Sequence, residues 1–354
     1  MSCVELVISY YALTGIYIPD AIWLFSTDEE AKHMKYDLLI GIDGGGTHST
    51  AAAAWPDGRI AAVAYGDGLN YHHIGTEKVR LRMEDMVSEL CRKAGAEHPL
   101  VCVGMSALDA PADEATLSRF TTGLFVPGQL DLQSDAYAAL MGFTRGKPGM
   151  IVICGTGSML LLLDEHGEQH VSGGWGYLLN DEGSSYTLAR EALLAVIDAY
   201  EGLGEATALT AHALDYFGVA SPRMIIDKIY APDFTPDRLA GFARHVLAEA
   251  ENGERIACAI LGRTMPRLAA QAAQLMKGSP GANRVGLYGG VFTHSAAARA
   301  CFTDTLCRLA PEAQICSLDY PPELGAIIHL MRREGLLCDS ALALLKNTYE
   351  EACL

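Results

Sequence analysis

The segment LLIGIDGGGT at residues 38–47 decides the fold. An apolar run that ends in Asp43 and a triple glycine is typical of a buried strand entering a tight turn. Two further extended segments follow at 49–55 and 59–65, with the turn Pro56-Asp57-Gly58 between them. The pattern predicts three antiparallel strands, and the glycine turn would face whatever the first hairpin binds.

The same order begins again in the second half of the chain. Residues 150–154 predict a strand that ends in Gly155-Thr156-Gly157-Ser158, 159–163 predict a second strand, and the turn 165–168 introduces a third. Apolar periodicity predicts the remaining helices at 75–94, 113–122, 136–143, 184–200, 207–217, 237–251, 254–277 and 322–333, and the remaining strands at 100–104, 129–133 and 284–288. This repetition indicates two related α/β halves, with residues 145–149 as the crossing between them.

The two glycine turns are candidates for phosphate binding. Glycine lets the backbone approach a bulky anion, and successive N–H groups with a hydroxyl can cradle its oxygens. Asp43, at the strand end, is placed to hold a divalent cation through water, as Mg²⁺ prefers. A tight hairpin without a ligand is the competing interpretation of either turn alone. Together the turns suggest a cleft for the terminal phosphates of a nucleotide, and their residues are Gly44, Gly45, Gly46 and Thr47 in the first and Gly155, Thr156, Gly157 and Ser158 in the second.

A carboxylate stands where a strand gives way to a helix, at Asp135 in Ser134-Asp135-Ala136-Tyr137. Facing the cleft, it could accept the proton of a hydroxyl that attacks the terminal phosphate. Aspartate is also a good helix N-cap, and position alone favours the cap.

Two later segments have unusual composition. Gly173–Tyr177 and Asn180–Ser184 combine glycines, an aromatic ring and clustered acids, which suits a polyol site. Alternatively, Ser184 caps the next helix, and Asp181 and Glu182 are first-turn acids favoured by its dipole. The strand and glycine pair in Gly286–Phe292 suit a purine or ribose, although a plain strand-to-helix turn explains them equally well.

Composition limits the class of protein. The chain has 354 residues, of which 50% are hydrophobic, and 26 basic against 43 acidic residues give a net charge of −17. These values exclude a small disulfide-stapled module and extensive disorder, and they argue against nucleic-acid binding.

The ten cysteines are scattered, which fits reduced thiols and a cytoplasmic location. Residues 1–33 form neither a convincing signal peptide nor a membrane span, and we expect them to be an extension that the core does not need.

These blocks, in this order, resemble the sugar kinase, actin and Hsp70 superfamily, and more narrowly the BadF/BadG/BcrA/BcrD ATPase family with its N-acetylglucosamine kinase branch. The resemblance runs from about Met34 to Gly335. Its most specific part is Gly173-Gly174-Trp175-Gly176 with Asp181-Glu182-Gly183-Ser184, which is similar to the signature of that branch.

The resemblance implies an α/β fold with two ribonuclease H-like domains (the actin-like ATPase fold) around an interdomain cleft. The domains would be 34–144 and 145–321, with the C-terminal helix 322–335 packing back on the first. Asp135 then matches the catalytic base, which favours that role over the cap, and Asp43 the residue near the metal. Sugar ligands would be Asn70, Gly174, Trp175 and Asp181, and ATP would be held by Asp43 to Thr47, by Gly155 to Ser158, and by Gly289 and Gly290.

The implied activity is Mg²⁺- and ATP-dependent phosphorylation of an amino sugar, first of all N-acetylglucosamine at its 6-hydroxyl. Glucosamine or another hexosamine is the nearest alternative. An activator ATPase of a 2-hydroxyacyl-CoA dehydratase would need a suitable cysteine pair, and a sugar-responsive regulator would need a DNA-binding segment. Whether the protein forms a homodimer is left open.

The chain departs from the family pattern at His48, where Lys or Arg is usual, at Ser106–Asp109, which lacks a glycine, and at Met159, which replaces an Asn of some relatives.

Overall fold

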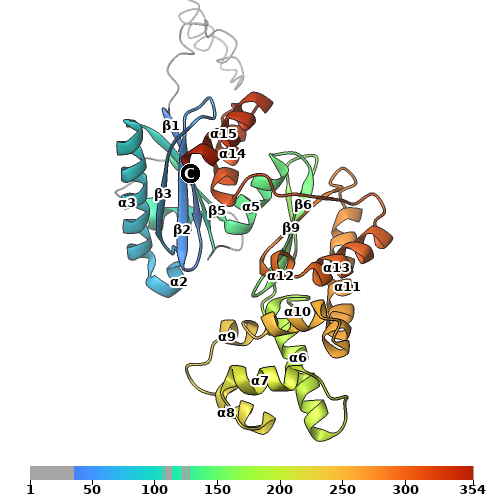
Figure 1. The fold of residues 1–354 in the computed structure, drawn as a ribbon. Coiled ribbons are helices and arrows are strands. Elements are labelled where there is room, and N and C mark those ends of the chain that lie inside the picture. Colours follow the sequence, from blue (N-terminus) through green and yellow to red (C-terminus); the bar gives the residue numbers. More distant parts are fainter. Residues whose placement is uncertain (1–35, 107, 109–113, 122–124, 126–127, 354) are drawn as a thin grey trace, which may run out of the picture.

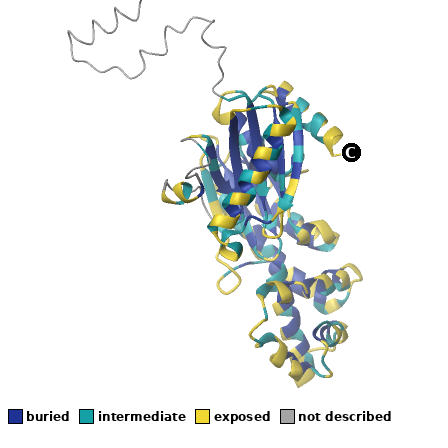
Figure 2. Cartoon of the chain, turned by 90° about the vertical axis from the view of Figure 1, so that its left-hand side faces the viewer, coloured by how far each residue is buried: buried dark blue, intermediate teal, exposed yellow. Residues whose placement is uncertain are grey.

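The computed structural model describes residues 36–106, 108, 114–121, 125 and 128–353. Two five-stranded sheets lie in separate parts of the molecule, each flanked by helices (Figure 1). Buried residues run along the strands, whereas exposed residues follow the outer faces of the helices (Figure 2). The predicted extension 1–33 lies outside the described residues, as do Ala107 and Asp109.

The first sheet has the strand order β3-β2-β1-β4-β5. Its first three strands are antiparallel, and β4 and β5 continue it in parallel with β1. The predicted hairpins at the glycine turn and at Pro56-Asp57-Gly58 are therefore confirmed. The strands are β1 (Leu38–Gly44), β2 (His48–Ala54), β3 (Ile60–Asp67), β4 (Pro99–Met105) and β5 (Leu130–Ser134).

The second sheet repeats this topology. Its order β10-β9-β6-β7-β8, read from the other edge, again places three antiparallel strands before two parallel ones. Two related α/β halves are thus confirmed. The strands are β6 (Gly149–Cys154), β7 (Ser158–Leu163), β8 (Gln169–Gly173), β9 (Arg284–Tyr288) and β10 (Gln314–Cys316), of which the short β10 was not predicted.

The helices form where apolar side chains recur every three to four residues. In α3 (Thr76–Ala94) such a stripe lies buried, and Gly95 ends the helix in the left-handed conformation. The predicted helix 237–251 is interrupted, because Phe242 donates its backbone N–H to Leu239 and buries its ring. The remaining helices are α2 (Tyr71–Ile74), α4 (Glu114–Thr121), α6 (Ser185–Glu201), α7 (Leu209–Phe217), η3 (Pro222–Met224), α8 (Ile225–Ile229), α9 (Pro236–Ala240), α10 (Ala243–Glu251), α11 (Arg255–Lys277), α12 (Gly290–His294), α13 (Ala296–Leu309) and α15 (Asp339–Ala352), besides the two below. The ends of the predicted helix 113–122 lie outside the described residues.

Two helices join the sheets. α14 (Pro322–Arg333) packs on β1 and β4, and α5 (Asp135–Thr144) packs on α14 and on β6 and β7 of the second sheet. One apolar cluster accordingly contains Leu39 of the first sheet, Leu161 of the second and most of both helices. α14 thus lies on the first sheet, while the boundary between two domains at residue 145 stays a prediction.

Two further observations concern the environment of the chain. The nine cysteines within the described residues are all free thiols, in keeping with the predicted reduced state. Across the same residues, none of the helices is both long and apolar enough to span a membrane.

Candidate active site

The first glycine turn leads from β1 into β2. Gly45 accepts a hydrogen bond from the Leu69 backbone N–H at 2.9 Å, and Thr47 accepts one from Gly68 at 2.9 Å, so the two residues that follow β3 hold the turn in place. No atom lies within 4 Å of a Cβ built on Gly46, and Thr47 is exposed. The tip of the turn is therefore open to a ligand.

The second turn is braced by the start of α6. Gly155 and Thr156 accept hydrogen bonds from the backbone of Ser185 and Tyr186 at 2.8 and 3.2 Å. The Asp181 carboxylate accepts from the backbone of Ser158. The second turn is consequently hydrogen-bonded to Asp181, which belongs to the predicted polyol segment Asn180–Ser184.

Asp135 is the first residue of α5, directly after β5. The N-cap of this helix is Ser134, whose hydroxyl accepts a hydrogen bond from the Tyr137 backbone. The interpretation of Asp135 as the cap is therefore wrong. One oxygen of its carboxylate accepts from the Ala136 N–H at 2.6 Å, which fixes the orientation of the group.

Three carboxylates meet where β1, α5 and α14 begin or end. Asp43 is paired in register with Gly104, and a Cβ on Gly104 would lie 3.3 Å from the Cα of Asp135. Glu323, in the first turn of α14, is 4% exposed and accepts a hydrogen bond from the Tyr349 hydroxyl of α15. Sequence reasoning identified two of these acids and missed Glu323.

Their proximity changes the protonation of Asp43. Burial, with the carboxylates of Glu323 and Asp135, raises the pKa of Asp43 to about 7. Burial also raises the pKa of Glu323. A poorly solvated carboxylate is stabilised by a proton or by a nearby cation, which fits the predicted contact of Asp43 with a divalent ion through water. Asp43, Asp135 and Glu323 are not grouped closely enough to ligate one ion directly.

We expect the raised pKa of Asp43 to make the free energy of unfolding depend on pH. Folded Asp43 binds its proton more tightly than Asp43 of the unfolded chain, where the pKa is 3.8. The stabilisation that this proton gives is therefore fully present below pH 3.8 and is lost as the pH rises toward about 7. The loss should reach up to about 4 kcal/mol, at about 1.4 kcal/mol for each unit of pKa.

Urea titrations of the metal-free protein and of Asp43→Asn at pH 4, 5, 6 and 7 measure this effect. The variant should lose that part of the pH dependence, because it cannot titrate. Identical pH profiles for the two proteins would contradict the shifted pKa.

One cavity of about 330 Å³ brings several predicted residues together. It lies between the halves, since Asp135 lines it from the first and the turn Gly155–Ser158 from the second. Gly174 and Asp181 line the same cavity. A carboxylate, a candidate phosphate turn and two predicted sugar ligands therefore share one space.

Asn70, Trp175, Gly289 and Gly290 do not line this cavity. Asn70 caps α2, and its side chain accepts a hydrogen bond from the His72 backbone at 3.0 Å. Trp175 is 69% exposed. Gly289 adopts φ +103° and packs so tightly on Cys154 that a Cβ there would lie 2.5 Å from its carbonyl oxygen, which puts Gly289 and Gly290 beside the second turn. The ligand roles of these residues stay predictions.

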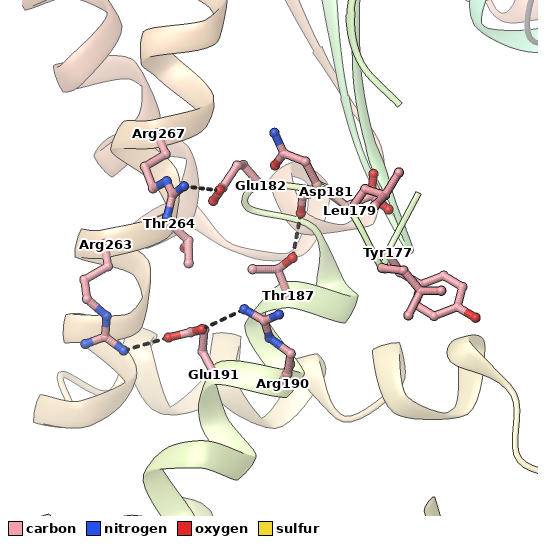
Figure 3. Close-up of a pocket in the computed structure, with 12 residues that line it drawn as sticks. Tyr177, Leu179, Asp181, Glu182, Thr187, Arg190, Glu191, Arg263, Thr264 and Arg267 are labelled. Atoms are coloured by element: carbon pink, nitrogen blue, oxygen red, sulfur yellow. Dashed lines mark hydrogen bonds and ion pairs between the residues drawn. The ribbon is translucent and has the colours of Figure 1, made fainter. Parts of the chain in front are cut away.

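We call residues 173–184 the signature segment. A second cavity, of about 270 Å³, lies between residues 177–182 of this segment and the helices α6 and α11 (Figure 3). Arg267 binds Glu182 at 2.8 Å, and the Ser184 hydroxyl accepts from the Thr187 backbone at 3.2 Å. The interpretation of Ser184 as the cap of α6 is thus confirmed. The interpretation of Asp181 and Glu182 as first-turn acids is wrong, because both precede the cap, and the Glu182 carboxylate is engaged by an arginine.

Comparison with known proteins finds sugar kinases among the relatives of this chain. An N-acetylmuramic acid/N-acetylglucosamine kinase of Clostridium acetobutylicum is 29% identical over 231 residues, which cover 64% of this chain and 75% of that protein. A glucosamine kinase of Vibrio cholerae is 28% identical over 233 residues, covering 64% and 76%.

A solved structure and a family model agree with these relatives. A Chromobacterium violaceum protein, provisionally described as an N-acetylglucosamine kinase, superimposes with a TM-score of 0.67 at 26% identity, covering 84% of this chain and 99% of its own. The predicted actin-like fold is thereby confirmed. The family model matches residues 40–327, and the chain belongs to the BadF/BadG/BcrA/BcrD ATPase family.

Proposed function

We propose that this protein is a kinase that transfers phosphate from ATP to an amino sugar, with the 6-hydroxyl of N-acetylglucosamine as the first acceptor to test. The observation that carries the proposal is the cavity in which Asp135 lies with the second glycine turn. The names of the relatives support this substrate class.

Asp135 would act as the general base. The hydrogen bond from Ala136 holds its carboxylate at the start of α5, facing the same cavity as Gly174 and Asp181. A sugar hydroxyl bound there could pass its proton to this carboxylate as the oxygen attacks.

The turns would bind the phosphates. Gly44 to Thr47 and Gly155 to Ser158 would approach the phosphates from opposite halves, and Gly289 and Gly290 would hold the adenosine end. In the second turn the N–H groups of Gly155 and Ser158 donate to Gly157 and to Asp181, so Thr156 and Gly157 would supply the donors to phosphate. ATP supplies the phosphoryl group, and Mg²⁺ neutralises the charge of its phosphates. Asp43 would hold that ion through water, with Glu323 behind it.

The sugar would lie against the signature segment. Trp175 is exposed enough to stack on an apolar sugar face, and Asn70 and Gly174 would contact its hydroxyls. The Asp181 carboxylate accepts from the Gly176 backbone as well as from Ser158. We therefore assign Asp181 the additional task of holding the phosphate turn against the sugar segment.

Two domains, 34–144 with α14 and 145–321, would close on the bound substrates. Such closure excludes water, which otherwise competes with the sugar as acceptor. The helices α5 and α14 pack between the sheets and would transmit the movement.

The direct test is ADP release in the presence of ATP, Mg²⁺ and one hexosamine at a time. We expect release with an amino sugar and none above background without a sugar. Identification of the phosphorylated carbon, expected to be C6, then defines the reaction. Absence of sugar-dependent ADP release across the panel would overturn the proposal.

The Vibrio cholerae relative favours glucosamine as the alternative acceptor. The same panel separates the two sugars by their kcat/KM. An iron–sulfur cluster in the purified protein would instead indicate the activator class of the family.

A further inference from the structure

Exposed apolar side chains are concentrated in one part of the second half. Among the described residues, most of the large ones belong to 171–230. The helix α6 runs through this region (Figure 1). A concentration of this kind on the surface of a folded protein commonly marks an interaction site.

The helix α6 has two different faces. Leu188, Ala192 and Val196 lie on the buried face and belong to the core on which α7, α9, α10 and α11 pack. On the other face Leu194 and Ile197 are 48% and 41% exposed. Two large apolar side chains on the outer face of a helix gain free energy when a second surface covers them.

Charged residues extend this outer face in both directions. Arg190 lies one turn before Leu194, Glu201 lies one turn after Ile197, and both are exposed. The four residues, which we call the α6 stripe, are separated by four, three and four positions. This is the spacing of a coiled-coil seam. The stripe is therefore basic at its start, apolar in its middle and acidic at its end.

The α6 stripe is complementary to a copy of itself in the reverse direction. In an antiparallel pair of helices centred between Leu194 and Ile197, each of these residues meets the other, and Arg190 of one copy meets Glu201 of the second. A parallel pair would place like charges opposite each other. Mutual contact of the same two residue types is the property of a two-fold interface, and the charges select its orientation.

The side of the stripe is complementary as well. Glu191 binds both Arg190 and Arg263 at 3.2 Å, so these three groups together carry a net positive charge (Figure 3). Asp198 is exposed two helical turns after Glu191 and therefore lies on the same side of α6. In the antiparallel pair, Asp198 of one copy would approach the positive group of the other.

We propose that the α6 stripe is a dimer interface, and that its occupant is α6 of a second copy of this chain in antiparallel orientation. A stable interface buries about 800 Å² of each partner. Tyr200 and Leu203, both exposed at the end of α6, widen the apolar surface toward that area. The inference is independent of the proposed kinase function.

Sedimentation equilibrium of the full chain tests the interface. The wild type should have twice the mass of the 37.9 kDa chain. Leu194→Glu would bury two charges against apolar side chains in each dimer and should raise the dissociation constant of the dimer at least about 100-fold. The matched control is Leu309→Glu on α13, where the leucine is 47% exposed, and it should leave the dissociation constant unchanged.

An exchange of charges tests the orientation. Arg190→Glu and Glu201→Arg each oppose like charges in the antiparallel pair, so each should raise the dissociation constant at least about fivefold. The double variant restores opposite charges and should return to within about twofold of the wild type. In a parallel pair the double variant would still oppose like charges, so failure to recover contradicts the antiparallel arrangement.

The remaining outcomes decide the proposal as a whole. A monomeric wild type would overturn it, as would a dimer that Leu194→Glu leaves intact or that Leu309→Glu weakens equally. Thermal melting of each variant establishes that it is folded, which we expect because every substituted side chain is exposed.

Discussion

Replacing Asp135 with Asn is expected to lower kcat for sugar phosphorylation at least about 100-fold, while ATP still binds. A general base contributes about 10²- to 10⁴-fold, and an amide cannot accept the proton. The substitution should not disturb the fold. Ser134, not Asp135, caps α5, and the amide oxygen of Asn can still accept the hydrogen bond from Ala136.

Initial rates of sugar phosphorylation and titration of a fluorescent ATP analogue measure the two effects separately. Asp227→Asn, an exposed carboxylate on α8, is the matched control and should retain normal turnover. Turnover by Asp135→Asn within a few-fold of the wild type would remove Asp135 as the base. Loss of nucleotide binding together with turnover would indicate a structural role instead.

The antiparallel strands that open both sheets could be predicted because local signals mark each hairpin. Each half opens with an apolar run that ends in a small-residue turn, at 44–47 and at 155–158. Such turns fix antiparallel partners by chain connectivity alone. The short β10 has no comparable signal, since its residues are partly exposed and pair with β9 over only three positions.

Glu323 could not be placed in the site from its local sequence. An acid in the first turn of a helix is ordinarily explained by the helix dipole. Its proximity to Asp43 arises from the packing of α14 on β1, far away in the chain, and its partner Tyr349 belongs to a helix beyond the family match. The spacing of Glu323 with Ile327 and Leu330 could have indicated that the acid is buried, but not which groups it faces.

The roles within the signature segment were predictable only in part. Glycines and acids at 173–184 marked a binding region, yet an acid's position does not show which way its carboxylate turns. Asp181 binds backbone donors and Glu182 binds Arg267, which lies on α11. The direction of each carboxylate depends on its neighbours in space, such as Arg267 for Glu182, and these are distant in the sequence.

Gly325→Ala is expected to destabilise the protein by at least about 3 kcal/mol or to prevent folding, because overpacking of a backbone crossing cannot relax through a rotamer change. Gly325 lies where α14 crosses α5. A Cβ there would overlap the Ala138 carbonyl oxygen and would lie 2.6 Å from the Gly142 nitrogen. Both obstacles are main-chain atoms, so the two helices would have to move apart.

Gly262→Ala is the matched control, since it is also a helical glycine. No atom lies within 4 Å of its added Cβ, and the residue is exposed on α11. Helix propensity predicts that this variant is more stable by about 1 kcal/mol. Urea denaturation of both variants measures the difference, and equal stability would show that the α5–α14 crossing is looser than its geometry implies. Because α5 begins at Asp135, any folded Gly325→Ala should also lose turnover through displacement of the base, whereas Gly262→Ala should not.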